Sequence, residues 1–342
     1  MKDIYKTIIF TKTPLKSYFK YENEFQIYPV EDKYLETKKH RHYPIFLEFK
    51  LNEEDKIKPQ FSIKEFEEQI SETATIQTKQ DKIINLLNLF STFTFFKYKI
   101  EGNWVLPITT KMSKEEISEI DGSEFLYNHF LHKGINLDII EFTEVSNQYK
   151  PIKVIEYSEY YQNEPNYDYD QTKEITLPNN IIMGLRAYFN LSTEEKRVID
   201  SAIKYSCLSM ELMEDKTTLG ILSAFTSIET VMNFYYKNYK PELCKECGQP
   251  RYKISKRYLD FLLDFIGNGD GFKKKFNNLY SLRSKIVHTG FSFSTEPFWN
   301  ELTEKEHDAE FVTILEIVML SKLSVINYLI LPSLSKKNKH HT

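Results

Sequence analysis

The chain has 342 residues, a formal net charge of −4 and 41% hydrophobic residues. This composition is typical of a folded protein with a sizeable core and excludes intrinsic disorder. The net charge argues against a protein that binds nucleic acid through charge alone. The charge is uneven, however, because ten Lys and Arg stand against four Asp and Glu between Lys245 and Lys285. The length is comfortable for two domains.

The start of the chain, M-K-D-I-Y-K, lacks the apolar run of a signal peptide. No window reaches about 18 uninterrupted apolar residues, the length needed to cross a bilayer. We therefore expect a cytoplasmic protein that has no membrane partner. Three cysteines are too few, and odd in number, for a disulfide framework.

The first half of the chain alternates polar and apolar residues as strands do. This period predicts strands at 4–11, 25–30, 43–51, 92–100, 135–145 and 152–161. Helical spacing marks residues 80–90, and the acidic stretch 113–133 is expected to be helical in part. The sequence therefore predicts an α+β domain, dominated by sheet, over residues 1–175.

Near residue 175 the period of the apolar residues changes from about two to about 3.6, which indicates a domain boundary. Residues 176–342 are predicted to form an all-α domain. Its expected helices lie at 180–191, 193–213, 216–239, 255–266, 272–289 and 306–331. Ser192 and Glu195 have the spacing of a capping box at the start of the second of these helices.

The helix expected at 272–289 carries the candidate site. Gly290 stands where a C-terminal cap belongs, so His288 should lie in the last turn, and Arg283 precedes it with R-x-x-x-x-H spacing. Five residues on an ideal helix turn 500°, which leaves the two side chains about 140° apart. They would share one face only if the last turn unwound.

The two residue types suit phosphodiester chemistry. Histidine titrates at about 6.5 and is the usual group for proton transfer at neutral pH. Arginine offers a permanently charged fork for a phosphate. On spacing alone, the alternative is a helix cap beside a surface arginine.

The context adds a resemblance. Helical S-A-F-T-S-I-E-T-V at 223–231, then a C-x-x-C-G turn, then L-R-S-K-I-V-H-T-G at 282–290 resemble a HEPN domain. More narrowly, they resemble the ApeA-type C-terminal HEPN domains of bacterial defence proteins. The resemblance implies a helical bundle that dimerises and cleaves RNA without a metal, with Arg283 and His288 at the motif positions. Ser284 stands where the family often has Asn, Asp or His.

The resemblance also implies a mechanism. In a homodimer, one His288 would act as base and its symmetry mate as acid, while both Arg283 side chains hold the phosphate. It further implies a toxin or anti-phage role, with an antitoxin or a phage-derived trigger as partner. One alternative is a catalytically inactive HEPN bundle that dimerises or binds RNA. Another is a zinc-dependent hydrolase.

Other charged residues have two interpretations each. Glu229 lies among apolar neighbours, so it is either a surface or paired carboxylate or a catalytic group that orients Arg283. Four lysines near the motif are either RNA-backbone contacts or a solvated face. They are Lys273, Lys274, Lys275 and Lys285.

Cys244 and Cys247 have the spacing of half a structural zinc site. The missing ligands would come from Cys207, a histidine or a partner chain, and the alternative is a reduced turn without metal. No cofactor is expected for catalysis. The remaining histidine pairs, H-x-H and H-x-x-H, are expected to be surface residues. They are His40 with His42 and His129 with His132.

Overall fold

The computed structural model describes residues 3–31, 42–57, 64–97, 136–163, 173–213, 215–239, 254–294, 296 and 303–338. The chain divides into two compact units, Met1–Ile182 and Met183–Thr342. This division falls slightly after the change of period near residue 175. The reason is that β7 (Leu177–Pro178) pairs in parallel with β6 (Val154–Ile155) of the first unit.

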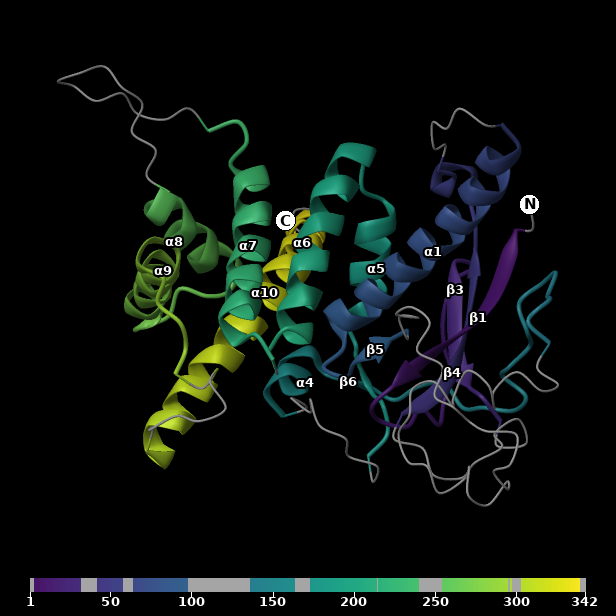
Figure 1. Cartoon of the computed structure of the whole chain (residues 1–342), viewed down its shortest axis with the longest axis horizontal. Helices are drawn as coiled ribbons and strands as arrows, with labels where there is room; N and C mark the ends of the chain where they lie inside the picture. Colours follow the sequence, from purple (N-terminus) through teal and green to yellow (C-terminus); the bar gives the residue numbers. More distant parts are fainter. Residues whose placement is uncertain are drawn as a thin grey trace. The chain divides into compact units, whose positions relative to one another are not determined.

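The first unit is built on a five-stranded antiparallel sheet with the order β2-β3-β4-β1-β5 (Figure 1). The strands are β1 (Ile4–Thr11), β2 (Phe19–Tyr21), β3 (Phe25–Pro29), β4 (Tyr43–Lys50) and β5 (Phe95–Phe96). The central strand β4 pairs with both β1 and β3 and is buried over most of its length. The predicted strands at 4–11, 25–30 and 43–51 are confirmed, as is the α+β class of this unit.

The two faces of the sheet have different covers. On one face, Tyr5 donates a hydrogen bond to Glu72 of α1 (Lys64–Phe90), at 2.9 Å. On the other face, Phe10 and its buried aromatic and aliphatic neighbours pack against Val145 of an irregular segment, residues 136–149. Because successive side chains of a strand point to opposite faces, each face of the sheet carries its own apolar layer.

A buried carboxylate fastens this irregular segment to the sheet. Glu48 on β4 is fully buried, and its two oxygens accept hydrogen bonds from Thr143 Oγ1 (2.6 Å) and Thr143 N (2.9 Å). Tyr28 and Gln26 on β3 donate to the same carboxylate at 2.5 and 2.7 Å, and Lys6 Nζ lies 3.5 Å away. Buried charges persist only when they are paired and hydrogen-bonded in this way.

Two predicted strands are wrong. Residues 136–145 are irregular, because their contacts run to Glu48 and the sheet rather than to a neighbouring strand. The stretch 152–161 forms only the short β6 before α4 (Tyr157–Asn163) begins. In α4 the buried Tyr160 hydroxyl accepts from Thr92 N at 3.0 Å and donates to the Thr176 carbonyl at 3.1 Å. These contacts with distant segments favour a helix over the strand that the alternating residues predict.

Other boundaries also differ. The helix α1 begins at Lys64, well before the predicted start at residue 80. A 3₁₀ turn lies at Glu53–Asp55. The predicted partly helical stretch 113–133 lies outside the described residues.

The second unit is all-helical, as predicted. Its helices are α6 (Thr193–Glu211), α7 (Thr217–Tyr235), α8 (Ile254–Phe265), α9 (Phe272–Thr289) and α10 (Glu304–Asn338), and α5 (Ile181–Phe189) leads into it. Ser192 caps α6 in a capping box with Glu195, which confirms the predicted start. The helix α10 begins two residues earlier and continues further than the predicted 306–331.

The helices α6, α7 and α10 form the centre of this unit (Figure 1). A Cβ atom on Gly220 of α7 would lie 2.9 Å from the Ser209 carbonyl oxygen, so glycine permits the close approach of α6 and α7. Ser206 of α6 and Ser321 of α10 are hydrogen-bonded at 2.9 Å. The fully buried Lys322 beside them places Nζ 3.6 Å from the sulfur of Met210.

Among the described helices, α10 alone is long and apolar enough to cross a membrane, over Glu304–Leu331. However, 61% of its most apolar window is buried against the rest of the protein. Core helices of water-soluble proteins have the same composition.

Candidate functional site

The candidate site is carried by α9. Phe276, Leu279 and Ile286 form its buried stripe, and Gly290 ends it in the left-handed conformation, with φ of 67°. Both features confirm the predicted helix and cap. His288 therefore lies in the last turn, where a cationic side chain interacts favourably with the helix dipole.

Arg283 is fixed against α7 by Glu229. Its Nε lies 2.8 Å from Glu229 Oε1, and its Nη2 donates a hydrogen bond to Oε2 at 3.0 Å. The side chains are 24% and 19% exposed, so the pair is largely removed from water. Beyond the end of α9, Phe293 N donates to Thr218 Oγ1 near the start of α7. These contacts join α9 and the segment that follows it to α7, and one side-on ion pair orients the guanidinium.

His288 does not share a face with Arg283. Because α9 remains helical through Thr289, the last turn does not unwind and the two side chains diverge by about 140°. His288 is exposed and makes no hydrogen bond or ion pair with any described residue. One chain alone thus offers a held arginine and, around the helix, a solvent-facing histidine.

The predicted lysines fall into two groups. Lys275 pairs with Glu316 of α10 at 2.7 Å, so its charge is already matched. Lys273 and Lys274 are exposed, and the Lys285 ammonium lies 4.0 Å above the Phe291 ring. Eleven residues of ideal helix separate Lys274 from Lys285 by about 16 Å and only about 20°.

A solvent-facing stripe therefore runs along α9. It contains Lys274, Ser281, Lys285 and His288, all of which are exposed. Ser284 is half-buried at its edge. Beside the stripe, α9 and α10 border a hollow of about 400 Å³ lined in part by Lys274, Lys275, Thr313 and Glu316. Two lysines without an acidic partner among the described residues, together with a histidine on the same helix face, suit a polyanion.

Tyr258 of α8 is a neighbour of the Arg283–Glu229 pair that the sequence did not single out. Its ring lies 6.4 Å from the Phe225 ring and 5.1 Å from the Tyr280 ring, about one turn from Glu229 and Arg283 respectively. The side chain is fully buried, and its hydroxyl has no hydrogen-bond partner in the described part of the chain. Burial and, secondly, the Glu229 carboxylate raise the pKa of this phenol, whereas Arg283 lowers it. The signal in the sequence was a tyrosine within the apolar stripe of its helix.

The predicted metal ligands have mixed outcomes. Cys244 and Cys247 lie outside the described residues, as do His40, His129 and His132. Within the described ranges, no group of three or more His, Cys, Asp or Glu is arranged to hold a metal ion. Cys207 is buried in the helical core, and burial raises the pKa of its thiol to about 12, which disfavours the thiolate that zinc binding requires.

His42 corrects one expectation. It was predicted to be a surface residue, but it is 7% exposed and its ring meets the Phe96 ring edge-on at 4.9 Å. His42 is buried because its ring packs against Phe96 on β5. A tertiary contact of this kind has no local sequence signal.

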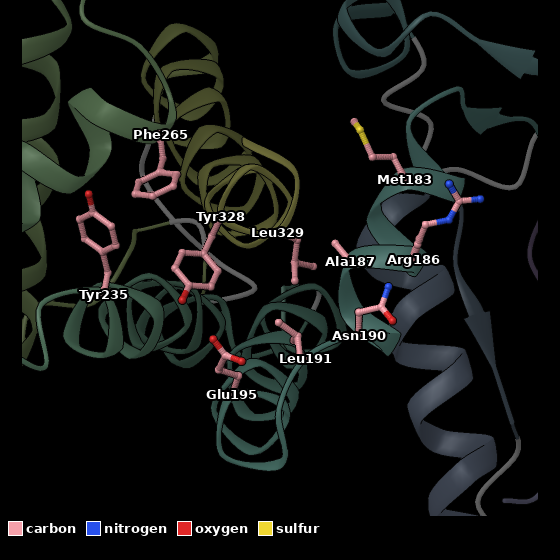
Figure 2. A pocket seen from close by; sticks show the side chains of 10 residues that line it. All are labelled: Met183, Arg186, Ala187, Asn190, Leu191, Glu195, Tyr235, Phe265, Tyr328 and Leu329. Carbon is pink, nitrogen blue, oxygen red and sulfur yellow. The ribbon is translucent and has the colours of Figure 1, made fainter. Parts of the chain in front are cut away.

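A larger cavity, of about 500 Å³, lies elsewhere in the helical unit. Figure 2 shows three aromatic rings on one side of it, from Tyr235, Phe265 and Tyr328, and residues of α5 on the other. None of the predicted site residues lines it. Its carboxylate, Glu195, already serves the capping box with Ser192. For phosphodiester chemistry, the groups on α9 are the better candidates.

The chain was compared with protein-family models, with curated proteins and with solved structures. None of the three comparisons found a match. The likeness to HEPN domains therefore rests on the motif residues quoted above, and the function is argued from the site itself.

Proposed function

We propose that the helical unit is a metal-independent endoribonuclease of the HEPN type. The observation that carries this proposal is the Arg283 guanidinium, held by Glu229 at a partly exposed position less than two turns before the helix end that exposes His288. A pre-oriented guanidinium stabilises the charge that develops on a phosphorane. An exposed imidazole can exchange protons with a ribose hydroxyl.

The reaction needs two proton transfers. A base removes the proton from the ribose 2′-hydroxyl, whose oxygen attacks phosphorus, and an acid protonates the departing 5′-oxygen. The products are a 2′,3′-cyclic phosphate and a 5′-hydroxyl. One histidine cannot readily do both, so His288 of a second copy would supply the other transfer in a two-fold dimer.

A dimer would also bring an arginine and a histidine together although they point apart within one chain. Within one chain Arg283 and His288 leave α9 about 140° apart, so one phosphate cannot easily meet both. A second copy, facing the end of α9, would bring its own His288 toward the first copy's Arg283. The partners implied are RNA and a homodimeric mate. By resemblance, the setting would be a cytoplasmic toxin or anti-phage effector controlled by an antitoxin or a phage-derived trigger.

The deciding experiment is RNA cleavage by the purified full chain in excess EDTA, with the product ends identified. We expect cleavage in EDTA, cyclic phosphate ends, and a loss of at least about a hundredfold in His288→Ala. Cleavage that EDTA stops would instead favour a zinc-dependent hydrolase. Unchanged cleavage by His288→Ala would refute the assignment of the histidine.

A second candidate is a catalytically inactive HEPN bundle that dimerises or binds RNA. The observation in its favour is that Glu229 neutralises Arg283 in a largely buried pair. Ser284, at the second motif position, is also a weak proton partner. This candidate predicts RNA binding by the wild-type chain without cleavage under any metal condition.

A further inference from the structure

The Arg283–Glu229 pair orients the guanidinium but reduces the net charge that a phosphate would meet there. Glu229 occupies the side-on edge of the guanidinium through Nε and Nη2. A carboxylate in contact with a guanidinium cancels most of its attraction for a second anion. The contacts use Nε and Nη2, so a phosphate can approach the rest of the guanidinium while the pair is closed, but it meets the full charge of Arg283 only when Glu229 gives way.

Opening the pair would leave the Glu229 carboxylate largely buried without its cationic partner. Its side chain is only 19% exposed, so water cannot fully replace the lost guanidinium. A buried carboxylate without a donor is strongly disfavoured. Its Oε1 is buried and meets Nε at 2.8 Å without completing a hydrogen bond within the described residues. A carboxylate oxygen can accept a second hydrogen bond, so Oε1 could accept one from another donor.

Tyr258 of α8 is a second hydrogen-bond donor near the pair. The ring of Tyr258 is held between Phe225 and Tyr280, which lie about one turn before Glu229 on α7 and Arg283 on α9. Its hydroxyl is buried, has no hydrogen-bond partner among the described residues, and interacts electrostatically with both members of the pair. Native proteins rarely leave a buried hydroxyl unpaired, so this one calls for a reason.

We propose that Arg283 and Tyr258 exchange on Glu229. In the resting state Glu229 holds Arg283, and when Arg283 turns to a phosphate the Tyr258 hydroxyl donates to Glu229 in its place. Tyr258 is then a positioning residue that acts through Glu229. This inference rests on the proposed function, because it concerns how the same arginine is released to RNA.

The test measures binding of a 2′-O-methyl RNA oligomer, which cannot be cleaved, by the full chain at fixed salt. Arg283→Gln defines the share of affinity that depends on the arginine. We expect Glu229→Gln to tighten binding and Tyr258→Phe to weaken it, each by about tenfold. In the Glu229→Gln background, Tyr258→Phe should have no effect, because no carboxylate then needs a donor.

The matched control is Tyr280→Phe, which removes the hydroxyl of the ring 5.1 Å from Tyr258 and should leave binding unchanged. The unfolding temperature gives a second readout. Because the Tyr258 hydroxyl is unpaired at rest, Tyr258→Phe should not lower it. A marked loss of stability would mean that the hydroxyl already has a partner, and would overturn the exchange.

Two further results would also overturn it. One is weaker binding by Glu229→Gln with no effect of Tyr258→Phe, which would make Glu229 a permanent support of Arg283. The other is binding that is independent of Arg283. The failure of the nuclease proposal is seen separately, as a wild-type chain that binds the oligomer through Arg283 but cleaves no RNA.

Discussion

Arg283 and His288 leave α9 on sides about 140° apart, Arg283 toward Glu229 and His288 toward solvent. A nuclease built from them needs two copies around one phosphate. Mixed dimers of wild-type and His288→Ala chains, isolated with two affinity tags, test this arrangement. If one shared site needs both histidines, the mixed dimer should retain less than about a tenth of wild-type activity.

The control for that experiment is the wild-type dimer carrying the same two tags. Two independent sites would leave the mixed dimer with about half of the control activity. A chain that remains monomeric at the concentrations where it cleaves RNA would contradict the shared site directly.

Lys274 and Lys275 are neighbours in sequence with different surroundings. Lys275 is paired with Glu316, whereas Lys274 belongs to the solvent-facing stripe with Lys285. We expect Lys274→Gln and Lys285→Gln each to weaken RNA binding and to reduce the salt dependence of log K by about 0.7 per lost phosphate contact. Lys275→Gln is the matched control and should have a smaller effect. Equal effects of all three substitutions, in titrations at several salt concentrations, would argue against the stripe.

Lys322 should make stability depend on pH. Burial lowers the pKa of this lysine to about 8 in the folded protein, from 10.5. Between these values the unfolded chain binds more protons, so the folded state gains stability as pH rises through this window. Below pH 8 the buried charge is fully present, and Lys322→Met should raise the free energy of unfolding by about 3 kcal/mol at pH 7.

The same difference should shrink by about 2 kcal/mol when it is measured by urea unfolding at pH 9.5. The exposed Lys204 lies on α6, and Lys204→Met serves as the control that should show no such dependence. A difference that stays constant from pH 7 to 9.5 would show that Lys322 is not a buried cation.

Glu48 should be the most sensitive charged residue of the sheet. Glu48 is fully buried, and removing it takes away the short acceptor of Tyr28, both acceptors of Thr143 and one of the two acceptors of Gln26. Glu48→Ala should therefore lower the free energy of unfolding by about 3–5 kcal/mol in chemical denaturation. Replacement of the exposed Glu141 by Gln should change it by less than about 0.5 kcal/mol.

The sequence predicted correctly those features that depend on residues close together in the chain. The capping box of Ser192 and Glu195, the C-terminal cap at Gly290 and the apolar stripe of α9 depend on neighbours within a few turns, and all were predicted. Glu48 and Tyr258 acquire their roles only from segments far away in the chain. Glu48 contacts Thr143, which is 95 residues distant.

The candidate site divides in the same way. Motif spacing singled out Arg283 and His288, and the apolar neighbours of Glu229 left its role open between a paired carboxylate and a catalytic group. The pairing of Glu229 with Arg283, across 54 residues, comes from the packing of α9 against α7. The ion pair of Lys275 likewise depends on Glu316, 41 residues further on. No pattern within a single helix could reveal either contact.

The long helix α10 closes the core of its unit from far along the chain. Its Ser321 meets Ser206 across 115 residues, and Lys322 meets Met210 across 112. During synthesis, α6 and α7 therefore emerge from the ribosome well before the helix that covers their shared apolar seam. Until α10 has been synthesised, the apolar surface that it covers on α6 and α7 stays exposed, and exposed apolar surface of this kind is what chaperones bind.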